Sequence, residues 1–289
     1  RLPINRKRQT MTNRRRSHTS VEEKRIIVYY RAEAGIMFDR KKYKSFARIQ
    51  LKRRRTVPAL MTLITVLVVL LLSLPLIKLW LAMYSELLNA AAAQSSRYVL
   101  QKIISNYQKE IERIAFLPWL VFFTIAVCAI AQFCVYLKMS RGPEPVSFGD
   151  FFAGFAYWLR AIGAALWCRL WTYLWMLLFI IPGIDKAIAY SQTFFIVAEF
   201  PHVPVVQALD ISKKITRGYK ADLFVLHLSF FGWYLLCVLT FGVASLWVVP
   251  YQMMTYINAY HGLMKRALET GVVTLEDIGD FDGEHYGKK

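Results

Sequence analysis

The feature that most constrains this chain is an apolar segment near its start. No charged residue interrupts the sequence from Val57 to Ile77. At about 1.5 Å per residue, a helix of this length spans the ~30 Å hydrocarbon core of a bilayer. Lipid offers no partners to backbone polar groups, so the segment is expected to be helical. Similar apolar segments recur along the chain, near 115–137, 161–183, 184–200, 222–239 and 243–264.

The repetition predicts an all-α fold, a polytopic transmembrane helix bundle with about six spans within residues 57–264. Composition agrees, because 56% of the residues are hydrophobic, against 45–50% in a typical soluble domain. Proline and glycine punctuate helices. Pro182, Gly183 and Pro201 are therefore predicted to be helix-breaking hinge positions around the fourth span.

The positive charge of the chain is concentrated before the first span. The net charge is +18, and residues 1–55 contain 19 Lys and Arg against 4 Asp and Glu. A nucleic-acid-binding arm would have such a charge, but no recognition motif accompanies it, so no nucleic acid is expected. The positive-inside rule instead places this end in the cytoplasm. Basic residues recur after every even crossing, which predicts six spans with both termini cytoplasmic and with Asp185 and Lys186 at the outer interface.

The segments outside the spans differ in character. Residues 1–36 are polar and are expected to be a disordered basic extension, and both an unusual native extension and a mis-called translation remain open. Residues 37–56 predict a basic amphipathic juxtamembrane helix on the inner membrane face. Its apolar residues recur at helical spacing, at Tyr43, Phe46, Ala47 and Leu51. Residues 265–289 predict an acidic cytoplasmic tail, and Ser147 is a predicted helix cap.

Charges at membrane depth need a partner, because each costs about 2.5–3.5 kcal/mol on insertion scales. Arg169 lies 13 residues before Pro182, and Glu199 lies 16 residues after Gly183. In a helical hairpin these positions are ~20 Å and ~24 Å from the turn. The arithmetic predicts an intramembrane ion pair between Arg169 and Glu199. A helix-locking pair, a substrate or proton site, and a lipid-headgroup contact all remain open.

A second amphipathic segment follows Pro201. Apolar residues of 205–220 share one helical face, and cations share the other. Such a helix can bind anionic headgroups of membrane lipids, or it can dock a membrane or cytoplasmic protein partner. The candidate binding residues are Lys213, Lys214, Arg217 and Lys220.

Catalytic and metal-binding signatures are missing from the sequence. It contains no nucleophile elbow, zinc-protease motif, phosphate-binding loop or dinucleotide fingerprint. The four cysteines fall in apolar segments with no CxxC spacing, at 128, 134, 168 and 237. We therefore expect neither an enzyme nor a bound cofactor or metal.

The second half of the chain resembles a known family. The residues that carry the resemblance include Ile181-Pro182-Gly183-Ile184, Ala198-Glu199-Phe200-Pro201, Gly218-Tyr219-Lys220-Ala221-Asp222 and Thr240-Phe241-Gly242. They are similar to the bacterial integral membrane family called domain of unknown function 975, over roughly residues 37–263. The resemblance implies a bacterial inner (plasma) membrane protein with about six helices. It implies no activity, because the family's function is undescribed.

Two functions remain in view. The first is a non-enzymatic membrane protein that acts through lipid or protein contacts in the cell envelope. The alternative is a transporter or permease-like subunit that moves a small solute. A transporter needs a polar pathway, and the first, second and sixth spans supply few polar groups for one.

Overall fold

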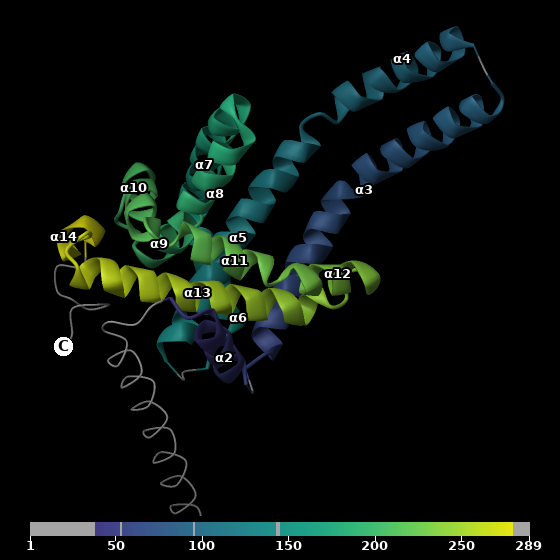
Figure 1. Cartoon of the computed structure of the whole chain (residues 1–289). Helices are drawn as coiled ribbons and strands as arrows, with labels where there is room; N and C mark the ends of the chain where they lie inside the picture. Colours follow the sequence, from purple (N-terminus) through teal and green to yellow (C-terminus); the bar gives the residue numbers. More distant parts are fainter. Residues whose placement is uncertain (1–37, 53, 95, 143–144, 280–289) are drawn as a thin grey trace, which may run out of the picture.

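A computed structural model of the chain describes residues 38–52, 54–94, 96–142 and 145–279. The predicted extension 1–36 lies outside these residues, as does the end of the predicted acidic tail. Every regular element in the described ranges is helical, so the all-α prediction is confirmed. Figure 1 shows α3, α5 and the α7–α8 pair leading away from a common base, across which α13 runs.

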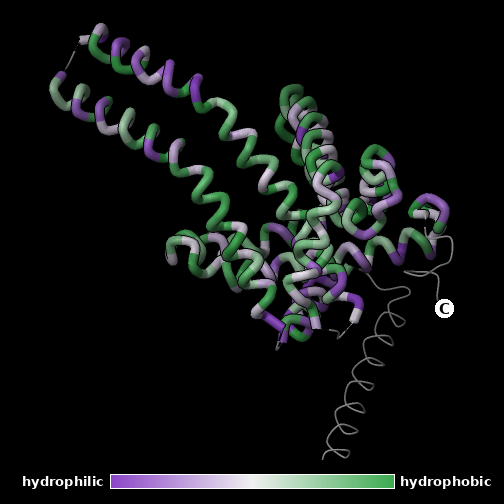
Figure 2. The backbone as a smooth tube through the Cα atoms, turned by 180° about the vertical axis from the view of Figure 1, so that it is seen from behind, coloured by the Kyte–Doolittle hydropathy of each residue, from purple (hydrophilic) through white to green (hydrophobic). Residues whose placement is uncertain are grey.

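A long helical hairpin forms the first part of the fold. It consists of α3 (Thr56–Ala92) and α4 (Arg97–Arg113), and α5 (Leu117–Arg141) returns to the base. The 37 residues of α3 extend over about 55 Å, which is roughly 25 Å more than the hydrocarbon core. Most of the segment 84–114 is helical, as the end of α3 and the whole of α4. Figure 2 shows hydrophilic residues gathered towards the distal half of this hairpin.

A short helix connects α5 to the third apolar segment. The Ser147 backbone N–H donates to the Asp150 carboxylate over 2.8 Å at the start of α6 (Phe148–Gly154), which confirms the predicted cap. A single 3-10 turn, η1 (Phe155–Tyr157), leads into α7 (Trp158–Leu178).

The helices α7 and α8 (Ile180–Ala189) form a close hairpin. The break lies at Phe179, which is extended with φ −157° and ψ 146°, and not at Pro182 or Gly183 as predicted. Pro182 falls in the first turn of α8, where a missing N–H costs no helical hydrogen bond. Gly183 instead permits close packing, because a Cβ there would come within 2.9 Å of the Met176 Cα.

The predicted fourth span, 184–200, is divided in the structure. After α8, a turn at 190–192 precedes α9 (Thr193–Glu199). With 10 residues, α8 is only about 15 Å long and is too short to cross the hydrocarbon core. Pro201 follows the end of α9, where the backbone becomes non-helical at Phe200, as expected of a residue before proline.

The remainder of the chain wraps around the base. It comprises α10 (Val205–Thr216), α11 (Lys220–Leu228), α12 (Phe231–Leu239), α13 (Ser245–Glu269) and α14 (Leu275–Ile278). The predicted fifth span corresponds to α11 and α12, and the predicted sixth span lies within α13. Figure 1 shows α11 and α12 beside α13.

The prediction of six spans is not confirmed. Within the described ranges, four helical segments are long and apolar enough to cross a membrane: Thr56–Ala92, Leu117–Arg141, Phe148–Leu178 and Lys220–Leu239. The helix α13 is not one of them because it carries polar side chains, and these are buried against protein at Gln252, Asn258 and His261. It packs on α2, α3, α5 and α10.

Within the predicted juxtamembrane segment lies α2 (Arg40–Leu51), which begins after the capping side chain of Asp39. Its apolar stripe does not face lipid as expected. Tyr43, Ala47 and Leu51 are buried, and α2 packs along α13. The prediction failed here because an apolar stripe has the same spacing whether lipid or another helix covers it.

Candidate functional site

A buried polar cluster surrounds Glu199, the last residue of α9. The Glu199 side chain is fully buried, and its Oε1 lies 2.5 Å from an Arg141 guanidinium nitrogen of α5. The Tyr260 hydroxyl of α13 donates to Oε2. The His261 Nδ1 is 3.9 Å from Oε1. The helix α9 ends at Glu199, two residues before Pro201, and its last side chain lies where α5 and α13 meet.

The cluster extends into a network that joins four helices. The Ser140 Oγ of α5 is 2.9 Å from the His261 Nε2. The Gln50 amide of α2 donates to the Ser140 carbonyl over 3.4 Å. The Asn258 amide donates to Gln50 Oε1 over 2.8 Å. This network explains how α13 can bury so many polar groups, because buried polar groups need hydrogen-bond partners.

The electrostatics of the cluster keep His261 neutral near pH 7. Burial lowers the pKa of His261 to about 4, with Glu199 acting in the opposite direction and Arg141 in the same one. The Ser140 hydroxyl donates to the Leu137 carbonyl over 2.7 Å. The Ser140–His261 contact joins α5 to α13 within the cluster. The arrangement binds α2, α5, α9 and α13 together.

The predicted pair of Arg169 and Glu199 is not formed. The Arg169 guanidinium lies over the Phe122 ring, 4.9 Å from its centroid, while Glu199 contacts Arg141. The prediction assumed one straight helix from the α7–α8 turn to Glu199. The turn at 190–192 interrupts that helix, and the Glu199 side chain at the end of α9 meets Arg141 of α5 instead. Arg141 has a sequence signal, a cation ending an apolar segment, but nothing local links it to Glu199.

The candidate headgroup-binding cations of α10 and α11 mostly have partners within the protein. The Lys213 ammonium lies 5.7 Å from the Tyr190 ring centroid, Lys214 pairs with Asp210 at 3.2 Å, and Lys220 pairs with Asp185 at 2.6 Å. Arg217 is exposed. The apolar face of α10 is buried, so this helix packs on protein and not on lipid.

The Lys220–Asp185 pair also bears on topology. The six-span arrangement places Asp185 at the outer interface and Lys220 at the inner one. Their 2.6 Å contact places both at one level, so this part of the arrangement is wrong. The physical reason is again the short α8, which returns beside α7 without crossing.

No group of three or more His, Cys, Asp or Glu side chains is placed to hold a metal ion anywhere in the described ranges. The four cysteines are free, and Cys128 and Cys168 are buried.

One comparison with known proteins gives a match. Residues 172–267 match the model of a family described as "Protein of unknown function (DUF975)", which confirms the resemblance seen in the sequence. The matched region includes Glu199, Tyr260 and His261, whereas Gln50, Ser140 and Arg141 lie before it. No curated protein and no solved structure matches the chain.

Proposed function

We propose that this chain, whose residues 172–267 match the DUF975 family, is an integral membrane protein that acts by binding anionic lipids. The binding surface is the basic outer side of α2 and the start of α3. The observation that carries the proposal is the burial of the apolar side of α2 against α13. With that side occupied, α2 presents cations to its surroundings.

The cations of this surface lie on α2 and in its connection to α3. Arg40 and Lys41 are in the first turn of α2, Lys52 follows α2 and Arg55 precedes α3, and all four are exposed. Arg54 donates to the Met139 and Gly142 carbonyls at the end of α5, which aligns the two helix ends. Cations beside an anionic leaflet are each worth about 1 kcal/mol of attraction. Their position suits the headgroup layer, on the cytoplasmic side of a bacterial inner membrane by the positive-inside rule.

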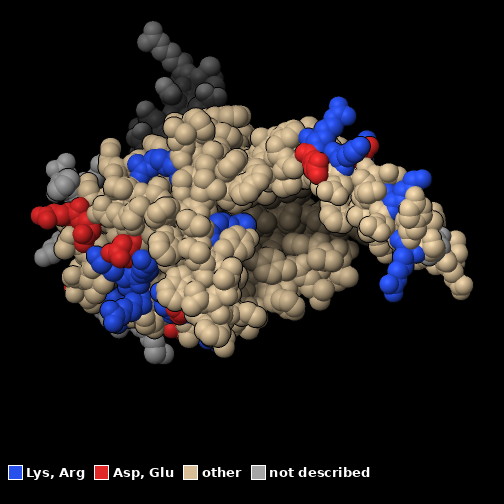
Figure 3. Space-filling model, turned by 90° about the horizontal axis from the view of Figure 1, so that it is seen from above, with Lys and Arg blue, Asp and Glu red and all other residues tan. Residues whose placement is uncertain are grey.

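The charge distribution supports a membrane setting. On the face seen in Figure 3, most Lys and Arg lie towards the two ends of the molecule, with a largely uncharged surface between them. Large side chains on the candidate spans are exposed, among them Leu71 at 68% and Trp80 at 61%. Many large apolar side chains exposed side by side on a protein surface indicate contact with lipid or with another protein.

The alternative, a permease-like subunit, would need polar groups left available along a pathway. The Glu199 cluster has its polar groups directed at one another. Binding is therefore the better supported action, and we propose no catalytic step.

Thermal unfolding of the detergent-purified full chain tests the proposal, because a ligand that binds only the folded state raises the unfolding midpoint. Added phosphatidylglycerol is expected to raise the midpoint more than phosphatidylcholine, and salt is expected to reduce the difference. The triple variant Arg40→Gln/Lys41→Gln/Lys52→Gln should reduce this difference between the two lipids, because three exposed cations are removed. Arg97→Gln/Lys102→Gln/Lys109→Gln on α4 is the control with the same charge change. Equal effects of the two lipids on the wild-type protein would contradict the proposal.

A further inference from the structure

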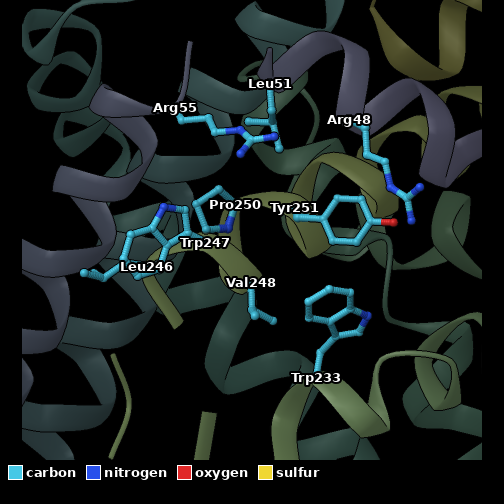
Figure 4. Close-up of a pocket in the computed structure, with 9 residues that line it drawn as sticks. All are labelled: Arg48, Leu51, Arg55, Trp233, Leu246, Trp247, Val248, Pro250 and Tyr251. Atoms are coloured by element: carbon cyan, nitrogen blue, oxygen red, sulfur yellow. The ribbon is translucent and has the colours of Figure 1, made fainter. Parts of the chain in front are cut away.

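A cavity opens beside the basic surface of α2. It has a volume of about 360 Å³ and lies between the end of α2, the start of α3, α12 and the start of α13. Figure 4 shows Arg55 extending over the cavity above Trp247, Arg48 beside the Tyr251 ring, and Trp233 of α12 at the lower edge. None of these residues belongs to the Glu199 cluster, so the cavity is a separate feature.

The walls of the cavity are apolar and aromatic. Trp233 is 40% exposed and Trp247 is 57% exposed, which is unusual for such large side chains in a soluble core. Trp and Tyr favour the membrane interface, where an apolar ring and a polar edge are both accommodated. The deeper wall includes the buried side chain of Val248.

The rim carries two guanidinium groups without a carboxylate partner. Arg48 lies over the Tyr251 ring, 5.6 Å from its centroid, and Arg55 precedes the first turn of α3. Within the described residues, neither forms an ion pair. Guanidinium is well suited to phosphate because it offers several donors in a planar fork. Two such groups at the mouth of an apolar cavity match a ligand with a phosphate at one end and a hydrocarbon chain at the other.

We propose that this cavity binds one anionic phospholipid, with its phosphate between Arg48 and Arg55 and the first part of an acyl chain against Trp233 and Trp247. The inference rests on the proposed function and adds a defined site to it. The volume is at the lower end of the range for ligand pockets, so the cavity holds only part of the lipid. The rest of the chain leaves along α12, where Leu235, Val238 and Leu239 are 55%, 73% and 70% exposed. Free phosphate would leave the apolar walls unused.

Native mass spectrometry of the full chain from mixed phosphatidylglycerol and phosphatidylcholine micelles tests the site. The wild-type protein should retain one phosphatidylglycerol in preference to phosphatidylcholine. Arg48→Gln/Arg55→Gln should weaken retention at least about tenfold, since charged hydrogen bonds are lost. Lys41→Gln/Lys52→Gln, the matched charge change at the start and the C-cap of α2 and outside the cavity lining, should weaken it much less.

A second variant tests the cavity without altering charge. Leu246→Trp adds bulk to the lining and should displace the acyl chain, so that retention falls although both arginines remain. Arg48→Lys/Arg55→Lys keeps the charge and should still weaken retention several-fold, because the fork geometry is lost. Circular dichroism of each variant confirms that it is folded.

The outcomes separate the site from the general proposal. If Lys41→Gln/Lys52→Gln weakens retention as much as the arginine pair does, or if Leu246→Trp retains the lipid, the cavity proposal is overturned while binding at the basic surface stands. If inorganic phosphate alone stabilises the protein as much as phosphatidylglycerol does, the site is one for a free anion and the cavity proposal is again overturned. Equal retention of both lipids by the wild-type protein would overturn both proposals.

Discussion

At the scale of single residues, the buried carboxylate of Glu199 depends strongly on its partners. A buried carboxylate loses its hydration, and this loss must be offset by paired charge and hydrogen bonds. Arg141 and Tyr260 provide them. The residue therefore fixes the relative positions of α5, α9 and α13, and its removal should weaken the packing of all three helices.

Glu199→Ala is expected to lower the free energy of unfolding by roughly 2–4 kcal/mol, because it leaves Arg141 without its anion in a partly buried position. This loss is smaller than the loss expected for a fully buried ion pair, because the Arg141 side chain is 40% exposed. Chemical or thermal unfolding in detergent measures it. Asp210→Ala, which removes the exposed Lys214 pair, should cost at most about 0.5 kcal/mol. Similar losses for the two variants would show that the buried pair has no special role.

The stability of the protein should also depend on pH through His261. Its folded-state pKa is lowered to about 4 from an ordinary 6.5. At pH values between these two, the unfolded chain therefore binds more protons than the folded chain. The stabilisation by neutral His261 is therefore complete above about pH 6.5 and is lost as pH falls towards 4. Unfolding midpoints measured across this range should fall with pH, and His261→Gln should flatten the slope. A slope unchanged in His261→Gln would assign the dependence to other groups.

At the scale of elements, the α7–α8 hairpin shows how one small residue permits close packing. Its tip, Leu177–Ile181, is 62–86% exposed, and no charged residue lies between Arg169 and Asp185. The tip therefore suits insertion into hydrocarbon. Next to the tip, Gly183 packs so closely on Met176 that a Cβ at position 183 would lie 2.9 Å from the Met176 Cα.

Gly183→Ala should separate α7 from α8 and lower the unfolding midpoint, because the new Cβ would lie 2.9 Å from the backbone Cα of Met176. Gly163→Ala is the control within α7. Its Cβ would meet only Val205, at 3.9 Å, and replacing a helical glycine with alanine stabilises a helix by about 0.5–1 kcal/mol. Thermal unfolding of both variants gives opposite signs if the packing argument is correct.

At the scale of the whole molecule, α13 organises the fold by lying across the bases of other helices instead of running beside them as a further span (Figure 1). Its polar side chains bond to α2, α5 and α9. The Asp185–Lys220 pair then joins the α7–α8 hairpin to the start of α11. Both features follow from packing between segments that are distant in sequence.

Cysteines introduced at 185 and 220, one at a time in a background without the native cysteines, should react with a membrane-impermeant maleimide from the same side of the membrane. The six-span arrangement requires opposite sides. Labelling of intact and inside-out vesicles distinguishes the two, and opposite-side labelling would show that the ion pair does not form in the bilayer.

Much of the fold could be predicted from the sequence, for a local reason. Apolar segments such as 57–77 must satisfy their backbone groups internally, so helix and membrane class follow from the residues in each segment. The Ser147 cap and the break before Pro201 are likewise set by immediate neighbours. The resemblance in residues 181–260 also depends only on the order of residues, and the family match confirms it.

The tertiary structure alone decided which helix faces meet protein and which partners the charges take. The stripe of Tyr43, Ala47 and Leu51 would read the same against lipid, yet α13 covers it. Glu199 pairs with Arg141 of α5 and not with Arg169, and a turn at 190–192 interrupts the single helix that the hairpin arithmetic assumed. Ion pairs and packing depend on the positions of segments far apart in sequence, whereas helix formation depends on neighbours within a few residues. That difference in range separates what the sequence determined from what the packing decided.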